Sequence, residues 1–165
     1  MNLKNLSKNF YIETSIILII FLLDRFSKIF VIYLDKKNPT SEIYISKFLN
    51  INLIWNDGIA FGLFSFEKTN LYNFLSIVIL LIIIFILIMI IKTQGIKKYP
   101  LLILFGGALG NIFDRIIYRS VPDFIDFHVG NFHWFVFNIA DVFITFGVIF
   151  MILLEITGNN KHTKL

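Results

Sequence analysis

Residues Ile77 to Ile91 read Ile-Val-Ile-Leu-Leu-Ile-Ile-Ile-Phe-Ile-Leu-Ile-Met-Ile-Ile, and this stretch without a polar side chain decides the fold. With its flanks it reaches the roughly 20 apolar residues that a helix needs to cross a bilayer. Of the 165 residues in the chain, 57% are hydrophobic. Soluble domains contain only about 45–50% apolar residues. The sequence therefore predicts an integral membrane protein.

Three further segments are long and apolar enough to cross the membrane. Together with the first they predict an all-α membrane protein with four transmembrane helices and a small extracytoplasmic β-element. The spans are expected at roughly 11–34, 71–91, 99–118 and 137–156, in a single domain over residues 1–165. The N-terminal apolar run lacks the small-residue cleavage site of a signal peptide, so we expect it to remain as an uncleaved span.

The outer segments 35–70 and 119–136 should form the β-element. In the first segment, Glu42–Ile45 and Leu49–Ile54 are β-branched or alternate polar with apolar residues, as strands do. In the second, two strands should flank Gly130-Asn131, a dipeptide suited to a two-residue primed turn. These strands are expected at 122–129 and 132–137. Counting back from the turn pairs Asp123 with Asn138 and brings Asp123 within about one helical turn of Asp141.

The distribution of charge predicts the orientation of the spans. An even number of spans places both tails and the loop near residues 92–98 on one side. These parts carry seven lysines: Lys4, Lys8, Lys92, Lys97, Lys98, Lys161 and Lys164. The positive-inside rule therefore places both termini in the cytoplasm. The net charge of +4 suits this topology better than nucleic-acid binding.

Five polar side chains lie within or at the edge of the apolar segments: Asp24, Asn111, Asp114, Asn138 and Asp141. Ionisable groups in a membrane span are costly, so they usually face the bundle interior and mark a functional site. At about 1.5 Å per residue, all five should lie in the outer half of the bilayer. Asp123 and Asp141 are then the best candidates for a facing pair of carboxylates.

Two facing carboxylates can hydrolyse a peptide bond. Like charges a few ångströms apart share one proton, so one group is ionised and the other is protonated. The ionised group takes a proton from the attacking water, and the protonated group polarises the carbonyl oxygen. This chemistry needs neither a metal nor a serine. The chain has no cysteine, which excludes disulfides and thiolate catalysis, and His128 and His133 lack the spacing of a zinc protease.

Two other functions fit parts of the sequence. A small proton-coupled transporter would also carry acidic groups in its spans, although its key carboxylate should lie near the bilayer midplane. A serine–lysine peptidase would need Ser27 to face a lysine, and the adjacent Lys28 points elsewhere on a helix. Other roles also stay open: Asp24 and Lys28 as a structural pair, Asp114 as an ion-pair partner of Arg115, and Asn111 and Asn138 as helix-bonding or substrate-binding groups.

Five ordered motifs resemble those of the lipoprotein signal peptidases, also called signal peptidase II, over nearly the whole chain. The motifs are Asp24-Arg-Phe-Ser-Lys28, Asn56-Asp-Gly-Ile-Ala-Phe-Gly62, Gly106-Gly-Ala-Leu-Gly-Asn-Ile-Phe-Asp-Arg115, Val121-Pro-Asp-Phe-Ile-Asp126 and Phe137-Asn-Ile-Ala-Asp141. The sequence departs from the family pattern at Trp55, Ile59 and Pro122.

The resemblance implies an aspartyl endopeptidase of the bacterial cytoplasmic membrane, with its active site at the outer face. The substrate would be a prolipoprotein carrying diacylglycerol, cut before its modified cysteine, and globomycin would inhibit the cleavage. Membrane lipid is the other expected partner, and no cofactor or metal is expected. The catalytic residues would be Asp123 and Asp141. Supporting or substrate-binding residues would be Asp24, Lys28, Asn56, Asn111, Asp114, Arg115 and Asn138.

Overall fold

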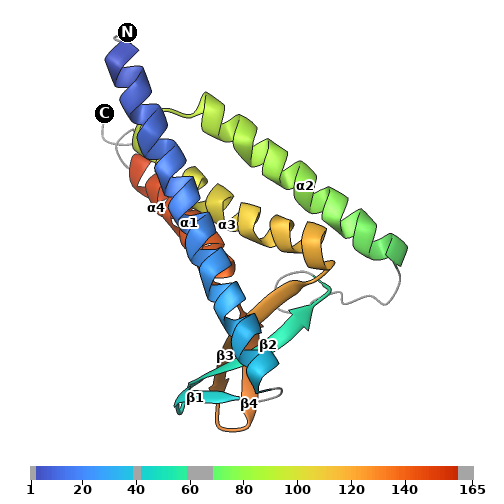
Figure 1. Cartoon of the computed structure of the whole chain (residues 1–165). Coiled ribbons are helices and arrows are strands. Elements are labelled where there is room, and N and C mark those ends of the chain that lie inside the picture. Colours follow the sequence, from blue (N-terminus) through green and yellow to red (C-terminus); the bar gives the residue numbers. More distant parts are fainter. Residues whose placement is uncertain (1–2, 39–41, 59–68, 160–165) are drawn as a thin grey trace.

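The computed structural model describes residues 3–38, 42–58 and 69–159 (Figure 1). The first and last described residues lie at one end of the molecule, and a small sheet lies at the other. In chain order the elements are α1 (Leu3–Lys37), β1 (Ile43–Ser46), β2 (Leu49–Asn56), α2 (Thr69–Lys92), η2 (Gly95–Lys97), α3 (Lys98–Tyr118), β3 (Val121–Val129), β4 (Phe132–Phe137) and α4 (Ile139–Asn159).

Three helices among the described residues are long and apolar enough to cross a membrane. They are Tyr72–Lys92, Gly95–Tyr118 and Ile139–Gly158, and they overlap the predicted spans 71–91, 99–118 and 137–156. The remaining predicted span, 11–34, falls within α1, a continuous helix of 35 residues. Charged residues interrupt the apolar sequence of α1, at Asp24, Arg25 and Lys28, so α1 is not among these three helices.

Glycines allow α1, α3 and α4 to pack closely. A Cβ atom at Gly107 of α3 would lie 2.6 Å from the Ala140 carbonyl oxygen of α4, and one at Gly147 of α4 would lie 2.7 Å from Leu104 Cβ of α3. On the other side of α3, a Cβ at Gly106 would lie 3.0 Å from Ile20 Cβ of α1. Small residues permit this close approach between membrane helices.

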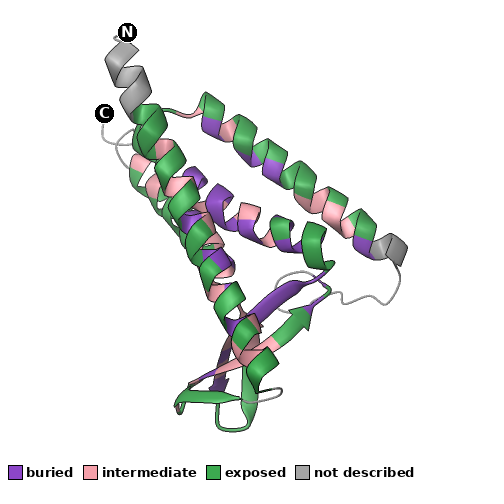
Figure 2. Ribbon diagram, viewed as in Figure 1, coloured by how far each residue is buried: buried purple, intermediate pink, exposed green. Residues whose placement is uncertain are grey.

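The helix α2 packs against α3 through an aliphatic contact. Ile83, Ile86 and Ile90 of α2 are buried together with Leu102 and Phe105 of α3. The rest of α2 is mostly exposed and apolar, which is the surface expected of a helix that faces lipid (Figure 2).

The predicted β-element is an antiparallel sheet of four strands in the order β1-β2-β3-β4. The strands β1 and β2 lie close to their predicted bounds of 42–45 and 49–54, and β3 and β4 match 122–129 and 132–137 to within one residue. Gly130 has a φ of +60°, and Asn131 is not among the residues of positive φ. This pattern fits a type II′ turn, which confirms the primed turn expected from Gly-Asn.

The predicted register of the β3–β4 hairpin holds only next to its turn. Val129 pairs with Phe132 and His128 with His133, as expected, but Phe127 pairs with Phe135. Trp134 is therefore an extra residue on β4, and the ladder beyond it is shifted by one. The prediction that Asp123 pairs with Asn138 across the ladder is wrong, because the ladder ends at the pair of Ile125 with Phe137.

Candidate active site

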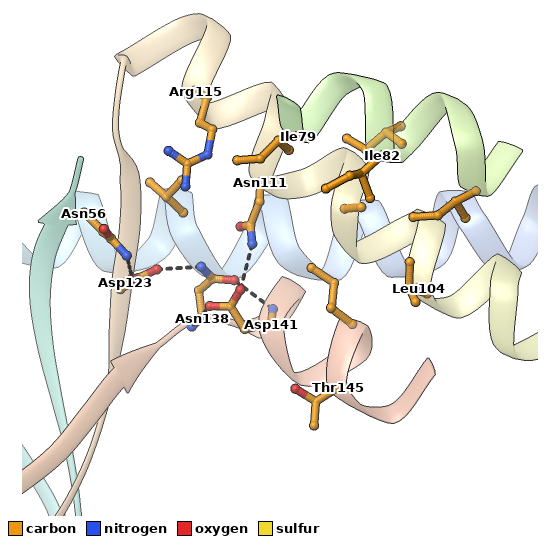
Figure 3. A pocket seen from close by; sticks show the side chains of 15 residues that line it. Asn56, Ile79, Ile82, Leu104, Asn111, Arg115, Asp123, Asn138, Asp141 and Thr145 are labelled. Atoms are coloured by element: carbon orange, nitrogen blue, oxygen red, sulfur yellow. Dashed lines mark hydrogen bonds between the residues drawn. The ribbon is translucent and has the colours of Figure 1, made fainter. Parts of the chain in front are cut away.

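Asp123 and Asp141 line one cavity of about 290 Å³ between the sheet and the helices (Figure 3). Asp123 is on β3, and Asp141 is in the first turn of α4. The polar end of the cavity also contains Asn56, Asn111, Arg115 and Asn138. The opposite end is an apolar wall made by Ile79, Ile82, Ile83 and Ile86 of α2, Leu104 and Ala108 of α3, and Ile144 of α4.

Asn138 connects the two carboxylates. Its side-chain amide donates to Asp123 Oδ1 at 2.6 Å, and its side-chain oxygen accepts the backbone N–H of Asp141 at 3.1 Å. In return, Asp141 Oδ2 accepts the backbone N–H of Asn138 at 3.2 Å. This reciprocal pair is a capping box at the start of α4, with aspartate in place of the usual glutamate. Asp123 and Asn138 are in contact although the register of β3 and β4 is shifted, because their side chains make the contact.

Asp123 is almost completely buried and accepts a hydrogen bond from a second side-chain amide. Asn56 Nδ2 of β2 donates to Asp123 Oδ2 at 2.8 Å, while Asn56 Oδ1 accepts the Gly58 backbone N–H, also at 2.8 Å. Burial, followed by the charge of Asp141, raises the pKa of Asp123 from 3.8 to about 6, although the bonds from Asn56 and Asn138 act in the opposite direction. Asp123 can therefore hold a proton at mildly acidic to neutral pH.

Asn111 links Asp141 to a buried lysine. Its amide donates to Asp141 Oδ1 at 2.8 Å, and its oxygen accepts a hydrogen bond from Lys28 Nζ, also at 2.8 Å. Because an ammonium can only donate, Lys28 requires the oxygen of Asn111 to face it. The amide of Asn111 must then point at Asp141. Each aspartate of the pair is thus held by oriented asparagine amides.

A buried cluster of four charges lies behind Asn111. Lys28 Nζ lies 2.8 Å from Asp24 Oδ1 and 2.7 Å from Asp114 Oδ2. Arg25 contacts the same two carboxylates, at 2.9 Å from Asp24 and 2.5 Å from Asp114. Two cations and two anions make the cluster neutral, which lowers the cost of burying it in a membrane protein. The predicted pair of Asp24 with Lys28 is confirmed.

Asp24 also reaches α4. Its Oδ1 accepts the backbone N–H of Ala140 at 3.0 Å, in the first turn of that helix. Backbone N–H groups in the first turn have no partner within the helix, and they favour a negative charge. The carboxylate of Asp24 therefore fixes the start of α4 against α1, one residue before Asp141.

Asp114 is part of a structural ion pair, as predicted, but its partners are Lys28 and Arg25 and not its neighbour Arg115. These neighbours on α3 point in different directions, since Asp114 turns to Lys28 and Arg25 whereas Arg115 Nη2 donates to the Gly58 backbone oxygen. Arg115 is buried and lines the cavity with the aspartates. Adjacent residues on a helix do not share a face, which explains the separation. Arg25 was missed as a partner, although it stands directly beside Asp24 in the first motif.

Ser27 and Lys28 do not form a catalytic pair. Ser27 Oγ donates to the Asp24 backbone oxygen at 2.8 Å, and Lys28 Nζ is bound by Asp24, Asn111 and Asp114. The geometry therefore gives no support to the serine–lysine alternative.

The departures from the family pattern lie beside the site. Trp55 and Pro122 are paired across β2 and β3, and the Trp55 ring packs edge-on against Tyr118 with centroids 5.4 Å apart. Pro122 lacks an N–H group but leaves the strand intact, since Val121 and Asp123 on either side are still paired with β2. Ile59 lies outside the described residues.

Comparison with known proteins identifies the family of this chain. The family model described as signal peptidase (SPase) II matches residues 16–157. A lipoprotein signal peptidase of Pelagibacter ubique (strain HTCC1062) is 52% identical over 99% of this chain and 98% of its own length. One from Francisella tularensis subsp. novicida (strain U112) is 40% identical, covering 73% of this chain and 77% of its own.

Solved structures resemble the whole fold. A bacterial membrane enzyme determined by the in meso method at 2.3 Å superposes with a TM-score of 0.69 at 27% identity, covering 92% of this chain and 91% of that one. A second such structure, at 1.9 Å, gives a TM-score of 0.68 at 29% identity over 87% and 91%. With three apolar helices, the protein is a multi-pass membrane protein, and the chain belongs to the signal peptidase II family.

Proposed function

We propose that this protein is a membrane-embedded aspartyl endopeptidase that removes signal peptides from diacylglyceryl-modified prolipoproteins, with Asp123 and Asp141 as its catalytic pair. The observation that carries the proposal is the shared cavity, in which both carboxylates lie and Asn138 bonds to both. Membership of the signal peptidase II family supports the substrate class.

The proposed reaction uses one proton held between the two aspartates. The ionised carboxylate takes a proton from a water molecule as its oxygen bonds to the scissile carbonyl carbon. The protonated carboxylate donates a hydrogen bond to the carbonyl oxygen, which gains negative charge. When the tetrahedral intermediate collapses, the C–N bond breaks and a proton returns to the nitrogen. The products are the signal peptide with a free carboxyl group and the mature protein with a free amine on its modified cysteine.

Three asparagines would hold the pair in position for this reaction. Asn56 and Asn138 bind Asp123, and Asn111 and Asn138 bind Asp141. The side-chain oxygen of each asparagine is already bonded to Gly58 N–H, Lys28 or Asp141 N–H, so none of the amides can rotate away freely. Such a fixed orientation contributes to catalysis because it keeps the reacting groups aligned before the substrate binds.

The rest of the cavity suits a substrate that is partly in the membrane. The aliphatic wall from α2 and α3 would contact the apolar part of the precursor, and Arg115 would lie near its backbone. A second groove of about 270 Å³ reaches Asp141 beside α4 and is lined by Phe135, Phe137, Val142, Thr145 and Phe146. We assign this apolar groove to an acyl chain of the diacylglyceryl group, which could enter sideways from the membrane lipid.

We further propose that α1 is the fourth span. It runs beside α3 and α4 from the end with the termini to the sheet (Figure 1), and its central charges are neutralised within the buried cluster. Both termini would be cytoplasmic, and the active site would be at the outer face of the bacterial inner membrane. Because the chain has no cysteine, single substitutions can report the side of each loop. A membrane-impermeant maleimide should label Phe132→Cys but not Lys97→Cys in spheroplasts, and the reverse result would invert the topology.

The catalytic assignment is tested with purified enzyme and a lipid-modified precursor. The wild-type protein and the control Asp35→Asn, near the end of α1 and outside the five motifs, should cleave before the modified cysteine, and globomycin should block this cleavage. Asp123→Asn and Asp141→Asn should remain folded and leave the precursor uncut. Near-normal cleavage by either variant would remove that residue from the pair. Substrate flux in vesicles without any cleavage would favour the transporter alternative.

A further inference from the structure

We propose that Asp126, His128 and His133 form a binding site for a divalent transition metal, with Zn²⁺ as the first candidate. The ligand atoms of these three side chains all lie within 4.8 Å of one another. Two imidazoles and a carboxylate are a donor set that binds Zn²⁺ with a fourth position open to water. The spacing of the two histidines alone does not reveal this site, because its third member is Asp126, an aspartate two residues before His128 on β3.

The backbone register brings the three residues to one face of the sheet. Asp126 and His128 are two apart on β3, so their side chains point to the same side. His133 of β4 is paired directly with His128, which places it beside them. Side chains paired in this way have Cβ atoms about 4.5–5.5 Å apart. The arrangement therefore rests on strand pairing as well as on the side-chain positions.

Two buried polar atoms of this cluster have no hydrogen-bond partner. They are Asp126 Oδ1 and His128 Nδ1, and their side chains belong to residues that are only 2% and 7% exposed. Buried polar atoms are nearly always paired, so each such atom calls for an explanation. A cation between the carboxylate and the imidazole would satisfy both atoms at once.

A simple ion pair explains only part of the cluster. His133 Nδ1 lies 2.6 Å from Asp126 Oδ2, and the rings of His128 and His133 are stacked with centroids 5.1 Å apart. That contact uses the other carboxylate oxygen and leaves Asp126 Oδ1 and His128 Nδ1 unpaired. In a tetrahedral site with ligand bonds of about 2.0–2.2 Å, ligand atoms lie roughly 3.3 Å apart. Rotation of the His133 side chain, which is 52% exposed, can supply this adjustment and leaves a path for the metal to enter.

The site is separate from the proposed catalytic pair. Asp123 is three residues from Asp126 on the same strand, so the two side chains point to opposite faces of β3. A bound metal would join β3 to β4 and stiffen the strand that carries Asp123. This inference does not depend on the proposed peptidase chemistry.

Metal binding can be measured on the full-length protein in detergent, after removal of any affinity tag and treatment with a chelator. The protein is incubated with Zn²⁺ in a neutral buffer and passed through gel filtration before metal analysis. Wild type should retain about one equivalent of Zn²⁺ and show a higher Tm with the metal. The variants Asp126→Asn, His128→Gln and His133→Gln should retain less than about a tenth of this and show no rise in Tm.

His162→Gln is the matched control, because it removes the third histidine of the chain from outside the cluster. It should bind like wild type. Equal retention by the cluster variants, or no retention by wild type, would overturn the proposal. If a variant does not fold, the Co²⁺ spectrum of the wild-type protein decides the question. Visible bands of tetrahedral Co²⁺ would support the site, and the weak spectrum of aqueous Co²⁺ would refute it.

Discussion

Asn138 and Asp141 hydrogen-bond each other reciprocally, through the Asn138 side-chain oxygen at 3.1 Å and Asp141 Oδ2 at 3.2 Å. This cap begins α4, and the Asn138 amide that remains reaches Asp123 at 2.6 Å. One residue thus starts the helix that carries one aspartate and also binds the other. The same local structure therefore begins α4 and aligns the proposed catalytic pair.

Two substitutions of Asn138 should separate capping from alignment. Serine is a good N-cap but is too short to reach Asp123, whereas alanine can do neither. Asn138→Ser should keep a Tm near wild type and lose roughly 100-fold in kcat/KM, the scale expected for a misplaced catalytic group. Asn138→Ala should lose similar activity and also about 1 kcal/mol of stability. Cleavage assays and thermal unfolding in detergent measure the two effects, and near-normal activity of Asn138→Ser would contradict the bridging role.

The pH dependence of cleavage should report the proton on Asp123. The proposed reaction needs one protonated carboxylate, and the pKa of Asp123 is raised to about 6. Activity should therefore fall as the pH rises through about 6, up to tenfold per pH unit. The measurement is the profile of kcat/KM against pH.

Removing Asn56 should move that profile in a known direction. The Asn56 amide bonds to Asp123 and lowers its pKa. Asn56→Ala removes the bond, so the pKa rises further and the decline in kcat/KM should shift to higher pH, although the maximum rate falls. A shift to lower pH would show that Asp123 is not the group that titrates.

Much of this arrangement could be predicted from the sequence. Span positions follow from apolar runs of the right length, and the β3–β4 turn follows from Gly130-Asn131, because both signals are local. The shared site was predictable because the polar residues of the spans fall at similar depths. The contact of Asp123 with Asn138 was predicted from a register that is wrong by one residue, and it holds because long side chains tolerate that shift.

Other contacts could not be predicted because they depend on helix rotation. Asp114 and Arg115 are neighbours in sequence, yet one faces the buried cluster and the other faces the cavity. Only the packing of α1 on α3 decides that Asp114 meets Arg25 and Lys28. The extra residue Trp134 in β4 could not be predicted from the sequence either, because strand bulges carry no strong sequence signal.

The buried lysine should be essential for stability. Lys28→Met removes one cation and leaves Asp24 and Asp114 with Arg25 alone. Breaking a buried ion pair in this way costs about 3–5 kcal/mol. The Tm in detergent should fall accordingly, and adding Asp114→Asn should restore part of it by removing the excess negative charge.

Lys97→Met is the matched control for Lys28→Met. Lys97 also pairs with a carboxylate, Glu155 at 3.0 Å, but the side chains are 54% and 63% exposed. Exposed pairs contribute only about 0–1 kcal/mol, so the Tm should barely change. Equal losses of Tm in the two variants would mean that burial of the Lys28 cluster is not what makes it important.

The close packing at Gly110 should also be important for stability and activity, because a Cβ atom there would collide with the carboxylate of Asp24. Gly110→Ala must displace that carboxylate from Lys28 and from the Ala140 N–H group. Overpacking costs about 1–3 kcal/mol. Alanine is favoured over glycine within a helix by about 1 kcal/mol, so the same substitution without a clash is neutral or stabilising. Gly158→Ala in α4 is that control, since the nearest atom to its new Cβ is 3.8 Å away. A lower Tm and reduced cleavage are expected for Gly110→Ala alone, and unchanged values would show that Asp24 can move without consequence.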